Sequence, residues 1–198
     1  MEPLTTRSKN MQSRRVLTYI ISISISIITA CHSKNAAQTS GNWISLFNGK
    51  NIYDWIVKIH HHDVGENFGN TFRVENGILS IRYDQYGENF NSRFGAIYYD
   101  KKFKNYRLKV EYRFVGETAL GAPSWGFRDS GVQYFGQDPS TIELNQPFPV
   151  CIEYNVHGGN GTDERPNGEI CTPGTSVEIK GEKNKSFCTL PDVKRTFH

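Results

Sequence analysis

The stretch Val150-Cys-Ile-Glu-Tyr-Asn-Val-His157 alternates apolar and polar side chains along its whole length. Because successive side chains of a β-strand point to opposite faces of the sheet, this alternation predicts a strand with one apolar face and one polar face. The apolar face would carry Val150, Ile152, Tyr154 and Val156. The polar face would carry Cys151, Glu153, Asn155 and His157. A strand of this kind favours an antiparallel sheet, which commonly has one packed face and one wet face.

Similar short patterns surround this stretch, whereas helical periodicity is almost absent from the chain. Residues 72–75 and 77–82 indicate a hairpin that turns at Glu75-Asn76-Gly77, and residues 106–114 alternate apolar with charged side chains. Further strands are expected at 94–99, near 124–135 and at 150–157. Many short strands without interposed helices predict an all-β sandwich or jelly roll of two antiparallel sheets.

The N-terminal region resembles an export signal. Arg14 and Arg15 precede the apolar and small-residue run 19–28, and Ile28-Thr-Ala-Cys31 resembles a bacterial lipobox. We therefore expect residues 1–30 to be a lipoprotein signal peptide, Cys31 to carry lipid, and the protein to be anchored to the membrane at the cell envelope. An ordinary signal peptide is the alternative. A transmembrane helix is less favoured, because the run is shorter than the ~20 residues that a span needs.

Removal of this signal changes the charge of the chain. Residues 31–198 hold 19 cationic and 19 anionic residues, so the formal charge of +3 for the whole sequence falls to zero. No basic patch then supports nucleic-acid binding. Residues 31–42 are polar and small, as in a tether. Residues 43–198 have the length of one domain that can bury a core.

Three further cysteines follow Cys31. Cys171 and Cys188 flank an expected hairpin over residues 176–188, and an exported chain meets oxidising conditions, so a disulfide between them is geometrically plausible. Cys151 lies in an apolar run and is expected to be a small buried thiol. The sequence contains no CxxC or HxxxH spacing, which disfavours zinc. The triplet His60-His61-His62 is expected to be a solvated loop.

Candidate ligand-binding residues gather in two segments. The polar face of 150–157 suits a carbohydrate cleft, although a plain solvated face gives the same pattern. Residues 125–131 place an arginine, an aspartate and a serine between glycines and aromatics, which indicates backbone held close to a ligand or a bulged strand. We expect substrate contacts from Trp125, Ser130, Gln133, Asn155 and Arg165. Trp125 could equally belong to the core, and Arg165 could form a surface ion pair.

Several stretches together resemble the 3-keto-disaccharide hydrolase domain family. The resemblance spans about residues 43–198. It rests on Trp43–Ile52 with Trp55, Asn67–Gly77, Tyr106–Phe114, Arg128–Gly131, Gly136-Gln137, Ile152-Glu153 and Cys171–Thr175. It implies a concanavalin A-like jelly roll and an exported enzyme that cleaves 3-keto-glycosides.

The implied reaction begins with removal of the C2 proton, which the C3 ketone acidifies, and continues with loss of the C1 leaving group and addition of water. Glu153 is the expected base, or a metal-binding carboxylate, and Arg128 is expected to stabilise the enolate. Asp129 and His157 are candidates for acid or ligand roles. A divalent cation could supply part of the role of Arg128, but no spacing of ligand residues in the sequence identifies a site for it.

Other interpretations remain open from the sequence. Asp129 and Glu153 could form the carboxylate pair of an ordinary glycosidase. The same fold also serves lectins, so the chain could be a non-catalytic carbohydrate-binding lipoprotein. The sequence ends at Phe197-His198 without a closing turn, so we expect a domain that is incomplete at its C-terminus, and an inactive fragment is a third interpretation.

Overall fold

The computed structural model describes residues 43–165, 167–183 and 187–189 of the chain. The chain divides into two units, Met1–Trp43 and Ile44–His198, and all described elements belong to the second. The expected signal peptide, the lipidation site Cys31 and the tether lie outside the described residues. Among the helices of the described part, none has the length and apolar character that a membrane crossing requires.

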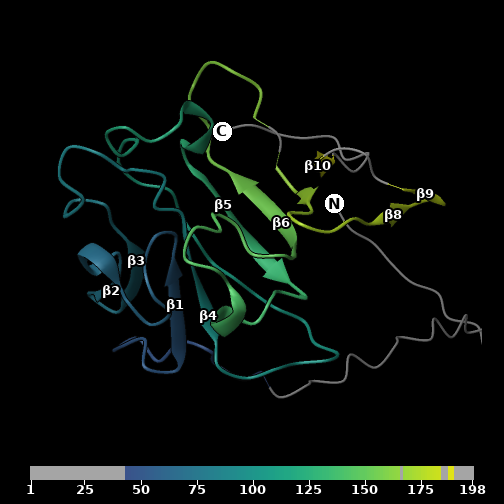
Figure 1. The fold of residues 1–198 in the computed structure, drawn as a ribbon, viewed down its shortest axis with the longest axis horizontal. Coiled ribbons are helices and arrows are strands. Elements are labelled where there is room, and N and C mark those ends of the chain that lie inside the picture. The colour runs from purple at the N-terminus through teal and green to yellow at the C-terminus, as the bar shows by residue number, and fades with distance from the viewer. Residues whose placement is uncertain (1–42, 166, 184–186, 190–198) are drawn as a thin grey trace, which may run out of the picture. The chain divides into compact units, whose positions relative to one another are not determined.

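The described chain is built from short strands and three single-turn 3-10 helices (Figure 1). The strands are β1 (Trp55–Ile59), β2 (Phe72–Glu75), β3 (Ile78–Ile81), β4 (Gly95–Tyr99), β5 (Asp129–Tyr134), β6 (Ile152–His157), β7 (Glu169–Cys171), β8 (Glu178–Ile179), β9 (Glu182–Lys183) and β10 (Cys188–Thr189). The 3-10 helices are η1 (Phe68–Asn70), η2 (Ser124–Gly126) and η3 (Pro139–Thr141). The all-β prediction is therefore confirmed.

Every described strand pair is antiparallel. The largest sheet has the order β10-β7-β6-β5, and β1-β4, β2-β3 and β8-β9 form two-stranded sheets. Figure 1 shows β5 and β6 side by side near the centre. This arrangement of antiparallel sheets is consistent with an all-β sandwich.

The predicted hairpin at residues 72–81 forms with the expected turn. Glu75 pairs with Ile78, which leaves Asn76 and Gly77 as the two loop residues. Their φ angles are +52° and +77°, in the left-handed region that asparagine and glycine tolerate best. The Asn-Gly pair therefore supplies the backbone conformation that a two-residue turn between twisted strands requires.

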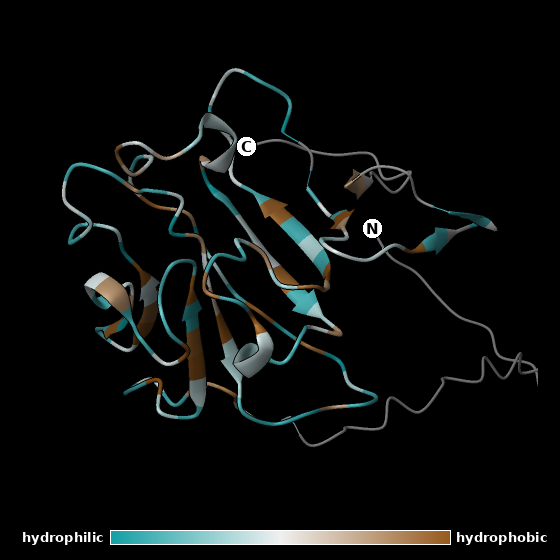
Figure 2. Ribbon diagram, viewed as in Figure 1, coloured by the Kyte–Doolittle hydropathy of each residue, from teal (hydrophilic) through white to brown (hydrophobic). Residues whose placement is uncertain are grey.

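One hydrophobic core cluster lies between β1 and β2. Val57, Ile59 and Phe72 are at most 4% exposed, and Ile97 of β4 packs against them. Burial of each such side chain contributes about 1.5–3 kcal/mol. Figure 2 shows apolar residues along β1 and β4, in agreement with this packing. A Cβ at Gly95 would lie 3.0 Å from Ile59, so the absence of a side chain there lets the two strands approach.

The predicted strand at 106–114 is not a strand in the structure. Tyr106, Leu108, Val110 and Tyr112 are 40–54% exposed, and no ladder joins this segment to another described strand. The ring of Tyr106 lies 6.5 Å from that of Tyr134 at the end of β5. An alternating pattern becomes a strand only where a neighbour supplies backbone hydrogen bonds, and that neighbour cannot be read from the alternation itself.

Other expectations are refined or corrected. The strand expected near 124–135 begins only at Asp129, because residues 124–126 form η2. The expected hairpin after Ser176 is shorter, with β8 and β9 joined at Lys180-Gly181. The histidine triplet forms a turn as expected, with His61 exposed, but His60 is 9% exposed and its Nδ1 lies 2.7 Å from the Ser92 carbonyl, so it is not solvated as expected.

The expected disulfide is confirmed. Cys171 and Cys188 are bonded, and they are directly opposite one another in β7 and β10. The cross-link thus holds the short edge strand β10 against β7 in the largest sheet. Cys151 is the buried free thiol that the sequence predicts, at 1% exposure, and burial followed by the nearby charge of Glu153 raises its pKa to about 12.

Candidate functional site

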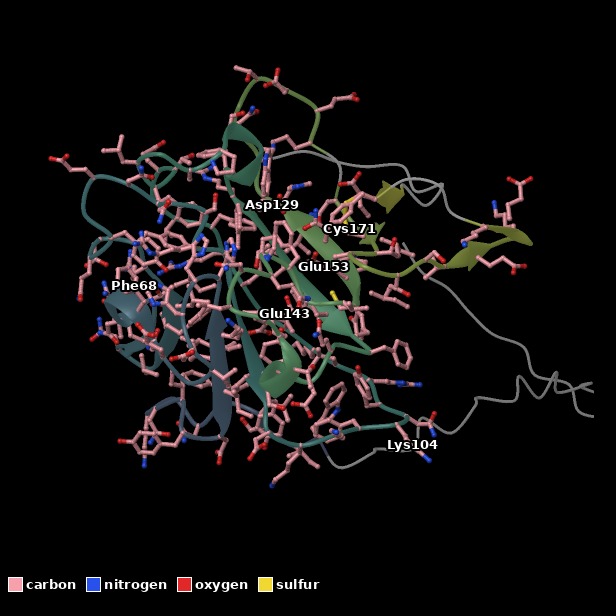
Figure 3. All side chains as sticks on the ribbon, viewed as in Figure 1. Phe68, Lys104, Asp129, Glu143, Glu153 and Cys171 are labelled. Atoms are coloured by element: carbon pink, nitrogen blue, oxygen red, sulfur yellow. A yellow bond between two sulfur atoms is a disulfide. The ribbon has the colours of Figure 1, made fainter. Side chains whose placement is uncertain are left out.

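Polar side chains from β5, β6 and β7 share one face of the largest sheet. Directly opposite residues of an antiparallel pair point to the same face. The register pairs Asp129 with His157, Gln133 with Glu153, and Asn155 with Glu169. These six residues are called the polar row. Figure 3 shows Asp129 and Glu153 over β5 and β6, with Cys171 beside them on β7. The predicted polar face of β6 is therefore extended by both neighbouring strands.

The imidazole of His157 lies between two carboxylates. Its Nε2 is 3.2 Å from Asp129 Oδ1, and its Nδ1 is 3.8 Å from Glu169 Oε2. Asn155 Nδ2 lies 3.3 Å from the same Nε2. All three ionisable side chains are at most 18% exposed. A mostly buried imidazole beside fixed carboxylates can accept or release a proton at a defined position.

Glu153 has the environment of an acid–base group. Its burial, and secondarily the charge of Asp129, raises its pKa to about 6, against a smaller opposing effect of His157. Its carboxylate lies over Gly131 of β5, where a Cβ would collide with it. Gly131 therefore leaves the space that Glu153 occupies. A carboxyl group whose pKa is close to neutral can take a proton from carbon and later release it to solvent.

The two arginines predicted for the site lie at one end of the polar row. Arg128 Nη1 donates to the carbonyl of Gly159 over 2.9 Å, and Arg165 Nη1 donates to the carbonyl of Gly158 over 2.6 Å. Both guanidinium groups lie beside the ring of Phe127, at 4.8 Å and 5.5 Å from its centroid. Together they fix the chain that follows His157. The Nε of Arg128 is buried without a hydrogen-bond partner in the described part of the chain.

The predicted substrate contacts are only partly brought together. Gln133 and Asn155 belong to the polar row. Ser130 pairs with Val156 in the register, so it lies on the opposite face of the sheet from Glu153. The structure therefore separates Ser130 from the polar row, because a shift of one residue along a strand reverses the face. Trp125 is 54% exposed in η2 and is not a core residue.

Two residues of this region were not predicted from the sequence. Glu169 extends the polar row onto β7, and the alternation Glu169-Ile-Cys171 beside a bridged cysteine was the available signal. Tyr98 of β4 places a buried hydroxyl near Cys151, without a hydrogen-bond partner in the described residues. Its burial, and then Cys151, raises its pKa above the ordinary value. No sequence signal pointed to Tyr98, because β4 contacts this region only in the folded chain.

The described side chains do not identify a site for the expected divalent cation. Within residues 43–165, 167–183 and 187–189, no group of three or more His, Cys, Asp or Glu side chains has an arrangement that could hold a metal ion. The divalent cation therefore stays a prediction.

Comparison with known protein families identifies the domain. Residues 42–196 match the family model described as a 3-keto-alpha-glucoside-1,2-lyase-like domain. The chain belongs to this family. The resemblance recognised in the sequence is confirmed, and with it the lectin/glucanase-like fold. The family indicates lyase-like or hydrolase-like activity on 3-keto-glycosides, and therefore a carbohydrate substrate. No curated protein and no solved structure matches the chain.

Proposed function

We propose that this protein cleaves 3-keto-glycosides by removing the C2 proton, expelling the C1 substituent and then adding water. The observation that carries the proposal is the position of Glu153, a largely buried carboxyl group with a pKa of about 6, in a polar row with Asp129 and His157. The family assignment supplies the substrate class.

Glu153 is the proposed base. A ketone at C3 acidifies the hydrogen on C2, so the carboxylate takes that proton while the C2–H electron pair forms the enolate. The electron pair of the enolate then forms the C1–C2 double bond, and the C1–O bond breaks. Its elevated pKa gives Glu153 more driving force for proton abstraction than an ordinary carboxylate has, while leaving it ionised at neutral pH.

His157 is the proposed acid. The departing oxygen gains a negative charge when the C1–O bond breaks, and a proton transferred from an imidazole neutralises it. His157 lies opposite Asp129 in the register, and Glu169 Oε2 is 3.8 Å from its Nδ1, so two carboxylates hold its ring. Asp129 and Glu169 then position the proton donor without reacting themselves.

Arg128 is proposed to stabilise the enolate oxygen at C3. One of its amino groups is committed to the Gly159 carbonyl, whereas the buried Nε has no hydrogen-bond partner in the described chain. A preorganised N–H of a cationic group can stabilise negative charge that develops during the reaction. This role predicts that Arg128→Lys, which keeps the charge but loses Nε, lowers kcat more than it raises KM.

The experiment is a comparison of Glu153→Gln with the wild type on methyl 3-keto-α-glucoside. Removal of a general base lowers turnover by about 10²–10⁴-fold. Glu143→Gln is the matched control, since Glu143 is exposed and lies outside the polar row (Figure 3). Unchanged turnover in Glu153→Gln would remove Glu153 from the mechanism. Dialysis against EDTA, followed by addition of Mg²⁺ or Ca²⁺, tests the expected divalent cation in the same assay.

We also propose that the protein is attached to the membrane at the cell envelope through lipid on Cys31. The support is the charged, apolar and small-residue order of residues 14–31. Cells fed an alkyne-labelled fatty acid should label the wild type and leave Cys31→Ser unlabelled. Equal labelling of both would contradict the proposal.

A further inference from the structure

Three aromatic side chains form an exposed row beside the site. Trp125, Phe148 and Phe187 are 54%, 36% and 58% exposed. The ring of Phe148 lies 6.4 Å from that of Trp125 and 6.4 Å from that of Phe187. These three residues are called the aromatic row. Scattered exposed aromatics are ordinary, but a contiguous row from three separate chain segments marks a binding surface.

The aromatic row packs against a half-buried ring, Phe94, and through it against a buried one. Phe94 stacks on Trp125 at 5.4 Å and lies 4.9 Å from Phe148. Phe94 in turn contacts Phe90, which is only 5% exposed, at 5.2 Å. The exposed rings therefore rest on a packed aromatic base. Rings held in this way lose little conformational entropy when a ligand covers them.

Hydrogen bonds connect both ends of the aromatic row to the chain that carries the polar row. At one end, Trp125 lies three residues before Arg128, and its carbonyl accepts from Arg165 Nη2 over 3.4 Å. At the other end, the carbonyl of Phe187 accepts from the backbone N–H of Thr172 over 2.9 Å. Thr172 follows Cys171, which is opposite Glu153 in the register. The backbone that carries the aromatic row is thus joined at one end to Arg165 and at the other end to the residue after Cys171.

We propose that the aromatic row binds the pyranose ring adjacent to the ring that reacts. Aromatic faces carry partial negative charge, so they attract the weakly positive C–H groups on a pyranose face. The reacting ring has lost its C3–H to a carbonyl, and its polar substituents need the polar row. The unoxidised neighbour keeps an uninterrupted C–H face. The inference rests on the proposed function and assigns the second sugar ring of the substrate to these three side chains.

The test compares 3-keto-trehalose with methyl 3-keto-α-glucoside, since only the former has a second ring. The alanine variants of Trp125 and Phe187 should lose about tenfold in kcat/KM on 3-keto-trehalose and less than about twofold on the methyl glycoside. Trp125→Phe should restore most of the loss. Tyr53→Ala, at an 89% exposed aromatic outside the row, should change neither value. Equal losses on both substrates would overturn the assignment.

A binding measurement separates this inference from the proposed reaction. Calorimetry with unoxidised trehalose and methyl α-glucoside needs no turnover. Tighter binding of trehalose, weakened about tenfold by Trp125→Ala, supports the aromatic row even if neither 3-keto-glycoside is cleaved. Identical affinities for the two sugars in the wild type would overturn it, and binding of an unrelated protein would then be the better explanation of the exposed rings.

Discussion

The position of Glu153 has a thermodynamic cost that can be measured without substrate. Its pKa is about 6 in the folded chain and has an ordinary value of 4.5 when solvated. At about 1.36 kcal/mol per pKa unit, the folded state disfavours the ionised side chain by about 2 kcal/mol. Replacement by glutamine removes this cost. Glu153→Gln should therefore stabilise the fold near pH 7.5 while it lowers turnover by about 10²–10⁴-fold.

The sign of the effect depends on pH. Because the folded state binds the Glu153 proton more tightly than the unfolded state, the stability of the wild type falls as the pH rises from about 4.5 through about 6. At pH 4 the carboxyl group is protonated in both states, and it then resembles glutamine in charge and shape. The advantage of Glu153→Gln should thus be small at pH 4 and reach about 2 kcal/mol at pH 7.5.

The assay is urea unfolding of the wild type, Glu153→Gln and Glu143→Gln at pH 4 and pH 7.5. Groups distant from Glu153 that titrate in this range affect all three proteins alike and cancel in the differences. Glu143→Gln should match the wild type at both pH values, because Glu143 is exposed. A stability difference between Glu153→Gln and the wild type that is independent of pH would refute the reasoning.

Three further predictions follow from the same contacts. The kcat/KM of the wild type should fall as the pH drops through about 6, since protonated Glu153 cannot act as a base. Asp129→Asn should move this fall in kcat/KM to lower pH, because the charge of Asp129 raises the pKa of Glu153. A fall that stays at the same pH would show that Asp129 does not influence the ionisation of Glu153. Reduction of the Cys171–Cys188 bond, which closes a separation of 17 residues, should cost about 3 kcal/mol in urea unfolding, and an unchanged midpoint would contradict a structural role.

Local patterns predicted the features that depend on local chemistry. The alternation of 150–157 correctly placed Glu153, Asn155 and His157 on one face of β6, but it did not indicate which face is buried. Val150 and Tyr154 of the apolar set are 38% and 47% exposed, whereas Cys151 and Asn155 of the polar set are 1% and 7% exposed. Asn76-Gly77 located the turn between β2 and β3. The pairing of Cys171 with Cys188 also followed from their places around a short connection. In each case, neighbouring residues determine the outcome.

Non-local pairing limited the remaining predictions. The segment 106–114 has the pattern of a strand but no described partner, and Ser130 lies on the face opposite Glu153 because of the β5–β6 register. Glu169 joins the polar row only because β7 pairs with β6. Arg128 has a φ of +47°, which changes the direction of the chain just before β5, and no residue pattern indicates that conformation for an arginine.

The proposed abstraction of the C2 proton is tested most directly with methyl 3-keto-α-glucoside that carries deuterium at C2. In ordinary water, early turnover by the wild type should give a free 3-keto sugar in which protium has replaced deuterium, with a primary isotope effect on kcat/KM. Incubation of labelled product without enzyme measures spontaneous exchange. Proton abstraction would be contradicted if the product kept its deuterium and if labelled and unlabelled substrates were turned over at the same rate. That result would favour direct displacement at C1 by the carboxylate pair Glu153 and Asp129.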